Sequence, residues 1–215
     1  MSTRIVCGVT TVASRFDGTL QTTLESIANG GFPKPSIFVD GCSDVNRYTP
    51  LGDLVSGRYP PHGCVGNWVT GLWSLFIHNR SADVYVMFQD DIIMSRNVCQ
   101  YLQRIPPDSK SYFNLYTVPS AEGAKPDDMT HGWYRPVQHG QGALGLAFNN
   151  EVVRKILINQ RVVDKVSSAG NPKTNLDGML CDMLADQGIM EYVHFPSIVQ
   201  HNGHVSTLGT RPRPT

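Results

Sequence analysis

Short apolar runs that alternate with helical patterns constrain the fold of this chain most. Residues 4–9, 37–39 and 84–88 are rich in Val, Ile and aromatic side chains, a composition typical of buried strands. Apolar residues recur at helical spacing over 20–28, between the first two runs, and a second helical pattern begins near Asn67. The alternation predicts an α/β fold: an open, mostly parallel sheet with helices on both faces.

The second half of the chain repeats this alternation less regularly. We expect strands over residues 112–118 and 142–148, a helix over 150–159 and a last helix over 174–187, before the apolar segment 189–199. In open sheets of this type, ligands bind beyond the carboxyl ends of the strands. Polar residues that directly follow a predicted strand are therefore the first candidates for a site.

The size and the charge balance exclude several classes of function. A chain of 215 residues is long enough for one large domain, which we expect over residues 1–208, with a flexible tail or a linker to further domains over 209–215. Lys and Arg together number 18, as do Asp and Glu, so no overall charge attracts nucleic acid. No apolar run reaches the roughly 20 residues of a membrane span. The five cysteines form no C-x-x-C pair, which favours a reducing, cytoplasmic setting.

The strongest local signal is a pair of acids at the end of the third run. Asp90 and Asp91 follow this run almost directly and precede two isoleucines. Adjacent carboxylates beside a buried strand repel each other unless a hard cation, Mg²⁺ or Mn²⁺, neutralises them. The alternative is that both acids only cap the turn after the strand. The abrupt change from apolar to acidic residues favours the metal.

Two histidines near the end of the chain form a second candidate. His201 and His204 flank an Asn-Gly pair, and imidazole is a common ligand of transition metals such as Mn²⁺. Taken singly, either histidine is more simply explained as a solvated loop residue.

Asp177 stands at the start of the last predicted helix. Together with Thr174 it matches the S/T-x-x-D/E pattern of a capping box, so that its carboxylate could do no more than cap the helix. A carboxylate in the first turn of a helix that faces a cleft could equally act as a general base toward an attacking hydroxyl.

The loop after the first run, residues 10–15, is rich in hydroxyl groups and ends in Arg15. Such donors suit a phosphate or a nucleotide, although an ordinary strand-to-helix loop explains them as well. Neither a G-x-G-x-x-G dinucleotide pattern nor a G-x-x-x-x-G-K-[ST] P-loop is present.

The order of these segments, from Arg4 to about Leu208, resembles that of the GT-A-fold nucleotide-sugar glycosyltransferases of the Asp-x-Asp type. The resemblance implies transfer of a sugar from a nucleoside-diphosphate sugar, with UDP-sugar favoured, to a hydroxyl of a glycan or glycoprotein acceptor. It also implies Mn²⁺ or Mg²⁺ as cofactor and inversion at the anomeric carbon. The short chain is similar to the small one-domain enzymes of bacteria or of large algal DNA viruses; the viral form, which we favour, would act in the host cytoplasm.

The resemblance further implies roles for individual residues. Gln89-Asp90-Asp91 is similar to the x-D-D metal motif, with Asp91 as the direct metal ligand and Asp90 as a sugar or ribose contact. His201, in a segment that reads P-S-I-V-Q-H-N-G, and His204 complete the metal shell, and Asp177 matches the base of inverting members. The other expected contacts with the donor are Thr10, Thr11, Arg15, Asp40, Asn67, Gln89, Gly142 and Ala143. Independently of the resemblance, Trp133 and Tyr134 could stack on an acceptor sugar, although packing is the simpler role of any single aromatic residue.

Two other classes of protein remain open from the sequence. A metal-dependent nucleotidyltransferase would use the same acidic strand end, but would release pyrophosphate rather than a nucleoside diphosphate. A non-catalytic carbohydrate-binding module would keep the aromatic residues near Trp133, but has no need of two acids at a buried strand end.

Overall fold

A computed structural model describes residues 3–105, 108–167 and 176–203 of the chain. Its central element is an eight-stranded sheet with the order β3-β2-β1-β4-β8-β6-β9-β7. The strands are β1 (Ile5–Val12), β2 (Ser36–Asp40), β3 (Val55–Arg58), β4 (Val84–Gln89), β6 (Ser111–Asn114), β7 (Gly132–Tyr134), β8 (Gly145–Asn149) and β9 (Met190–Phe195).

Four neighbouring strands, β3, β2, β1 and β4, run parallel, so their carboxyl ends meet at one edge of the sheet. The other half is mixed, because β8 runs antiparallel to both β4 and β6. A separate two-stranded sheet joins β5 (Ile92–Met94) to β10 (Val199–His201), with His201 opposite Ile92. This pairing brings the C-terminal histidine segment beside the residues that follow β4.

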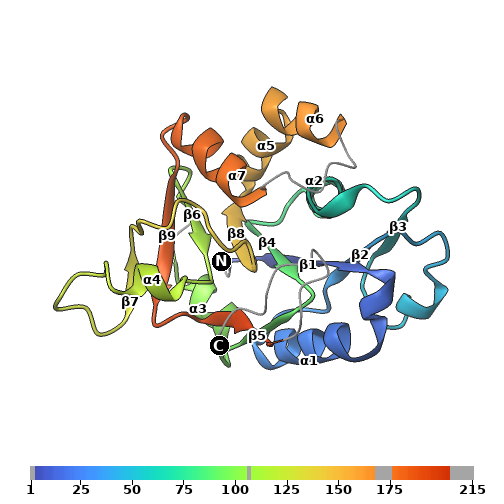
Figure 1. Cartoon of the computed structure of the whole chain (residues 1–215), viewed down its shortest axis with the longest axis horizontal. Helices are drawn as coiled ribbons and strands as arrows, with labels where there is room; N and C mark the ends of the chain where they lie inside the picture. Colours follow the sequence, from blue (N-terminus) through green and yellow to red (C-terminus); the bar gives the residue numbers. More distant parts are fainter. Residues whose placement is uncertain (1–2, 106–107, 168–175, 204–215) are drawn as a thin grey trace.

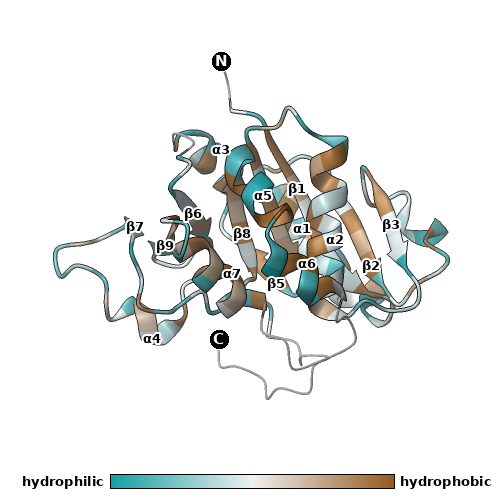
Figure 2. Ribbon diagram, turned by 90° about the horizontal axis from the view of Figure 1, so that it is seen from above, coloured by the Kyte–Doolittle hydropathy of each residue, from teal (hydrophilic) through white to brown (hydrophobic). Residues whose placement is uncertain are grey.

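Helices cover both faces of the sheet (Figure 1). One face packs against α1 (Gln21–Asn29) and α3 (Val98–Gln103) in a core that includes Ile27 and Leu102. The opposite face packs against α2 (Gly63–His78), α5 (Asn150–Leu157), α6 (Gln160–Ser167) and α7 (Leu176–Ala185). A short helix, α4 (Pro119–Glu122), precedes β7. Helices α5 and α6 carry hydrophilic residues along one side and hydrophobic residues along the other (Figure 2), as expected of helices at a protein surface.

The predicted fold class is confirmed: the chain is an α/β protein with a large, mostly parallel sheet flanked by helices. Some boundaries differ for identifiable reasons. Helix α2 begins at Gly63, earlier than the expected Asn67, because the carboxylate of Asp40 accepts the backbone N–H groups of His62 and Gly63.

The two later strands are shorter than expected. Strand β6 ends at Asn114, whose side chain accepts the N–H of Tyr116 and turns the chain. Strand β8 begins only at Gly145, because the N–H groups of Gly142 and Ala143 bond to Asp177 instead of a neighbouring strand.

Three further expectations concern the C-terminal part of the chain and its domain boundaries. The apolar segment 189–199 contains β9 and ends at the first residue of β10, and residues 174–175 and 204–215 lie outside the described residues. The single domain over 1–208 and the tail over 209–215 therefore stay predictions. No helix in the described segments combines the length and the apolar character of a membrane span.

Close packing of the sheet against α2 gives a first test. A Cβ added at Gly8 in β1 would lie 2.7 Å from a ring carbon of Phe38 and 3.1 Å from the sulfur of Met87. We expect Gly8→Ala to lower the free energy of unfolding by about 1–3 kcal/mol, the usual cost of overpacking. Urea denaturation measures this change. Gly123→Ala, where nothing lies within 4 Å of the added Cβ, is the control and should change little; equal stability of both variants would contradict the packing.

Candidate functional site

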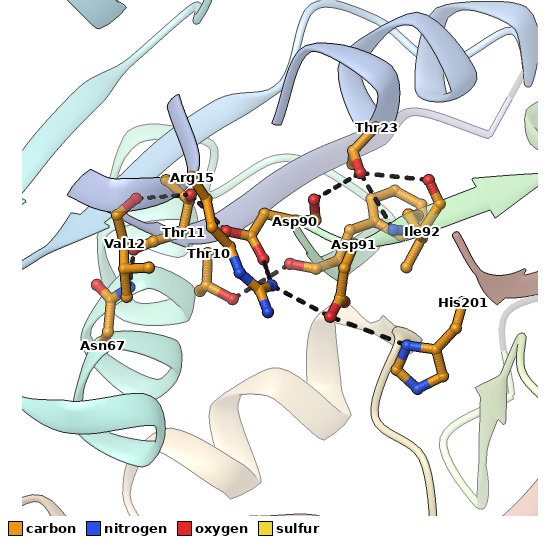
Figure 3. A network of polar contacts seen from close by, with 11 residues as sticks. Thr10, Thr11, Val12, Arg15, Thr23, Asn67, Asp90, Asp91, Ile92 and His201 are labelled. Carbon is orange, nitrogen blue, oxygen red and sulfur yellow. Dashed lines mark hydrogen bonds and ion pairs between the residues drawn. The ribbon is translucent and has the colours of Figure 1, made fainter. Parts of the chain in front are cut away.

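Asp90 and Asp91 directly follow β4, at the edge where the parallel strands end. Both are buried, with 4% and 5% of their surface exposed. The hydroxyl of Thr23 in α1 binds the backbone of this turn. It donates to the backbone carbonyl of Asp90 at 2.7 Å and accepts the N–H of Ile92 at 3.1 Å (Figure 3). The turn is therefore fixed by backbone contacts, which leaves both carboxylates available for other partners.

A single guanidinium lies between the two carboxylates. Arg15 forms ion pairs with Asp90 and, at 3.1 Å from Nη1 to Oδ2, with Asp91 (Figure 3). The hydroxyl of Thr11 donates to the other oxygen of Asp90 at 2.5 Å. Only 11%, 6% and 7% of the side chains of Arg15, Asp90 and Asp91 are exposed, so two acids share one base away from bulk water.

Burial and charge act in opposite directions on this group. Burial raises the pKa of Asp90, although the Arg15 guanidinium and the Thr11 hydroxyl oppose the change. Burial works to lower the pKa of Arg15, but the two carboxylates outweigh it and raise that pKa. Among the described residues, Oδ1 of Asp91 is buried and has no hydrogen-bond partner. The group has an excess of acid and an unused carboxylate oxygen, which together favour a further cation.

The acidic pair faces a cavity of about 380 Å³ at the carboxyl ends of β1, β2 and β4. The N-terminal turn of α2 forms another part of its wall. The lining residues are Thr10, Thr11, Val12, Ser14, Arg15, Asp40, Gly63, Cys64, Asn67, Gln89, Asp90 and Asp91. The structure thus brings together all the residues expected to hold the nucleotide from the first half of the chain. Val12 and Ser14 belong to the predicted loop of residues 10–15, whereas sequence reasoning missed Gly63 and Cys64, which have no distinctive pattern.

Asp40 and Asn67 support the cavity as well as line it. The two oxygens of Asp40 accept the N–H groups of His62 and Gly63 at 2.7 and 2.9 Å. The amide nitrogen of Asn67 donates to the carbonyls of Phe38 and Thr11 at 3.0 and 3.4 Å, which ties α2 to the ends of β1 and β2. The cavity is therefore preformed by side chains that also position the helix.

His201 lies on the far side of Asp91 from Arg15 (Figure 3). Its Nδ1 is 3.9 Å from Oδ2 of Asp91, and the N–H of Asn202 donates to the backbone carbonyl of Asp91 at 2.9 Å. His204 lies outside the described residues. Within residues 3–105, 108–167 and 176–203, no three His, Cys, Asp or Glu side chains gather as a metal site. Asp90, Asp91 and His201 thus lie near one another without forming such a three-residue cluster in the described segments.

Asp177 contacts the loop before β8. Its Oδ2 accepts the N–H groups of Gly142 and Ala143 at 2.9 and 3.1 Å. The three residues are brought together from α7 and the loop through hydrogen bonds that the sequence did not indicate. Thr174, the other member of the expected capping box, lies outside the described residues.

Glu191 is a polar residue of this region that sequence reasoning missed. It sits in β9 with 8% of its surface exposed, and accepts the side-chain amide of Asn114 and the N–H of Gly140, both at 2.9 Å. Burial raises its pKa, against these hydrogen bonds. The one acid in this mostly apolar strand was the available signal. Glu191 and Asp177 together fix the loop of residues 138–143 from two elements.

Trp133 and Tyr134 do not lie at the cavity. They belong to β7, the edge strand at the opposite end of the sheet from β3. The ring of Trp133 stacks on Tyr101 and packs against Phe113, and Tyr134 is 5% exposed with its hydroxyl bonded to the carbonyl of Ala121. Both rings are thus part of the packing at this edge. Strand β7 pairs with β9, and large aromatic rings in such a strand bury their apolar surface against neighbouring side chains.

The fold is shared with solved structures of transferases. GalNAc-T7 with UDP, GalNAc and Mn²⁺ has a TM-score of 0.66 and 10% identity, over 92% of this chain and 44% of that chain. The Methanothermobacter nucleotidyl transferase Mth528 has a TM-score of 0.55 and 14% identity, over 88% and 86% of the two chains. The apo form of the glycosyltransferase GlyE from Streptococcus pneumoniae TIGR4 has a TM-score of 0.53 and 13% identity, over 89% and 45%.

These similarities establish a GT-A-like fold and, at such low identity, the fold alone. This chain spans less than half the length of the two glycosyltransferase chains. No protein-family model matches the sequence, and no curated protein does. The comparisons therefore do not specify the activity, which depends on the residues of the site.

The buried Glu191 gives a pH test. Its pKa lies above the ordinary 4.5 in the folded protein, so the folded state resists an ionisation that the unfolded state undergoes freely. The contribution of Glu191 to stability is complete below pH 4.5 and is lost as the pH rises through the folded pKa. We expect Glu191→Gln, which has no charge to bury, to show a smaller decline in the free energy of unfolding between pH 4.5 and 7 than the wild type. Urea denaturation at several pH values measures both slopes; identical slopes would contradict this account.

Proposed function

We propose that this protein is a metal-dependent glycosyltransferase that moves a sugar from a UDP-sugar to a hydroxyl of a glycan or glycoprotein. The observation that carries the proposal is the buried pair Asp90 and Asp91, which faces a preformed cavity at the carboxyl ends of parallel strands. The GT-A-like fold supports it, since GalNAc-T7 of that fold is seen with UDP, GalNAc and Mn²⁺.

The charges of the cavity support a divalent metal, Mn²⁺ or Mg²⁺. Three carboxyl groups, of Asp40, Asp90 and Asp91, line it against the one guanidinium of Arg15. A nucleoside diphosphate adds further negative charge, which such a cavity repels unless a cation comes with it. Ions of this kind are commonly held by one or two protein carboxylates plus substrate phosphates, which fits the Asp91 oxygen that has no partner among the described residues. Asp91 and His201 would hold the metal, with His204 as a further proposed ligand. A bound metal would neutralise negative charge on the departing diphosphate.

The donor is proposed to lie along the cavity. Asp40 and Asn67 line the end near β2 and α2 and are assigned to the nucleoside. Thr10, Thr11 and Arg15 supply hydroxyl and guanidinium donors for the phosphates. Gln89 and Asp90 are assigned to the ribose or the donor sugar, together with Gly142 and Ala143 of the neighbouring loop.

Asp177 is the proposed base. One of its oxygens is held by two backbone N–H groups, which fixes the carboxylate beside the loop that precedes β8. A fixed carboxylate can take the proton of an acceptor hydroxyl as that hydroxyl attacks the anomeric carbon. In-line attack of this type inverts the configuration. We assign no acceptor role to Trp133 and Tyr134, and the cytoplasmic and viral settings stay predictions from the sequence.

Donor binding tests the metal assignment. We expect UDP to raise the melting temperature of the wild type with Mn²⁺ but little in EDTA, because a ligand that binds only the folded state stabilises it. Asp91→Asn should weaken Mn²⁺-dependent UDP binding by at least the roughly 10–100-fold that loss of outer-shell metal partners costs. Asp186→Asn, which removes an exposed carboxylate, is the matched control and should bind like the wild type. UDP binding that is indifferent to Mn²⁺ and to Asp91→Asn would contradict the proposal.

The released product separates the two transferase classes. With a UDP-sugar and an acceptor, a glycosyltransferase releases UDP, whereas a nucleotidyltransferase acting on UTP and a sugar phosphate releases pyrophosphate. We expect UDP from the first mixture and no pyrophosphate from the second, with the products of the two separate reactions measured by chromatography. Pyrophosphate from UTP and a sugar phosphate, without UDP from the UDP-sugar and acceptor, would assign the site to nucleotidyl transfer, as in the structural neighbour named a nucleotidyl transferase, Mth528.

Two substitutions separate catalysis by Asp177 from support of the loop. Asp177→Asn keeps an oxygen that can accept the N–H groups of Gly142 and Ala143, whereas Asp177→Ala removes it. If Asp177 is the base, both variants lose transfer by about 10²–10⁴-fold, and the Asn variant still binds UDP like the wild type. Steady-state kinetics and UDP titration measure this. Near wild-type transfer by the Asn variant, with loss in the Ala variant alone, would show that Asp177 only holds the loop through hydrogen bonds and is not the base.

A further inference from the structure

We infer that Arg15 is the resident counter-ion of the acidic pair, and that it couples metal binding to donor binding by competing with the metal for Asp91. The inference rests on the proposed function and extends it to the order of binding. A divalent ion alone is repelled by the guanidinium beside it, whereas an ion that arrives with a nucleoside diphosphate gives the guanidinium a new anionic partner.

The contacts of Arg15 carry the first step. Its Nη1 bonds to Asp90 and lies 3.1 Å from Oδ2 of Asp91, so the same atom serves both carboxylates. A carboxylate that neutralises a buried guanidinium is a weaker ligand for a second cation, because the two positive charges repel each other at short range. A metal at Oδ1 of Asp91 therefore lies close to the guanidinium that contacts Oδ2 of the same carboxylate, and the repulsion between the two cations weakens both contacts.

The cavity supplies the second step. Arg15 lines the same cavity as the acidic pair, together with Thr10 and Ser14 of its own loop. Its guanidinium can thus reach phosphate oxygens inside this cavity through a change of side-chain rotamer. Guanidinium groups bind phosphate through strong, charge-assisted hydrogen bonds. Release of Asp91 to the metal and capture of the diphosphate by Arg15 then favour each other.

Arg47 provides a matched contrast. Its guanidinium donates to the carbonyl of Ala13 at 2.8 Å and lies 4.3 Å from the centre of the Phe16 ring. In the described part of the chain it makes no ion pair within 4.0 Å, and it does not line the cavity. Arg47 supports the same loop as Arg15 without touching the acidic pair, so its removal controls for general effects on the loop.

The test is Mn²⁺ binding in the absence and presence of UDP, followed by the electron paramagnetic resonance signal of free Mn²⁺. We expect Arg15→Gln to bind Mn²⁺ alone roughly ten-fold more tightly than the wild type, within the usual range of coupling between two ligands. UDP should increase the Mn²⁺ affinity of the wild type strongly and that of Arg15→Gln by a smaller factor. Arg47→Gln should match the wild type in both conditions.

A second measurement covers the case in which Arg15→Gln folds poorly. Its two acids then lack a cation, so Mn²⁺ alone should raise its melting temperature more than that of the wild type. Arg15→Lys, which keeps one charge but loses the forked donors, should lie between the two. Equal or weaker Mn²⁺ binding by Arg15→Gln, with an equal or smaller thermal shift, overturns the inference. Failure of every variant to bind UDP would instead overturn the proposed function, because the comparison with Mn²⁺ alone does not depend on UDP.

Discussion

The buried pairing of two carboxylates with one guanidinium gives the candidate site its chemical character. The parallel strands β1, β2 and β4 end at one edge, and there the sheet places Asp90, Asp91 and Arg15 out of bulk water. Burying charge is costly unless it is paired. The pairing is incomplete, since one oxygen of Asp91 has no partner in the described part of the chain. This excess of acid makes the edge a site for a cation and for an anion that arrives with it.

A second set of carboxylates shapes the neighbouring loop. Asp177 from α7 and Glu191 from β9 accept backbone N–H groups of residues 140–143. These bonds keep β8 from beginning before Gly145 and hold the loop beside the ends of the parallel strands. The same antiparallel strand separates β4 from β6, so the loop adjoins the acidic edge because of the order of the strands. Asp177 and Glu191, from the last third of the chain, therefore hold a loop that lies next to the end of β4.

The sequence predicts the alternating elements and the acids at the end of β4, because both are local patterns: apolar periodicity and an abrupt change of polarity. It does not reveal the partners of those acids. Arg15 and Asp90 are 75 residues apart, Gly140 and Glu191 51, and Gly142 and Asp177 35. Such pairs depend on the order of the strands, which the local pattern does not specify. For Trp133 the sequence instead suggested a sugar contact, whereas the ring packs against Phe113. A sequence pattern cannot distinguish an aromatic ring that packs from one that binds a sugar.

The most direct measurement is anomalous diffraction from crystals grown with Mn²⁺ and UDP. The account predicts a manganese peak bonded to the carboxylate of Asp91 and to phosphate oxygens of UDP, with the guanidinium of Arg15 turned from the acids to the diphosphate. Nucleotide bound elsewhere, no manganese beside Asp91 and an Arg15 still paired with both acids would contradict it.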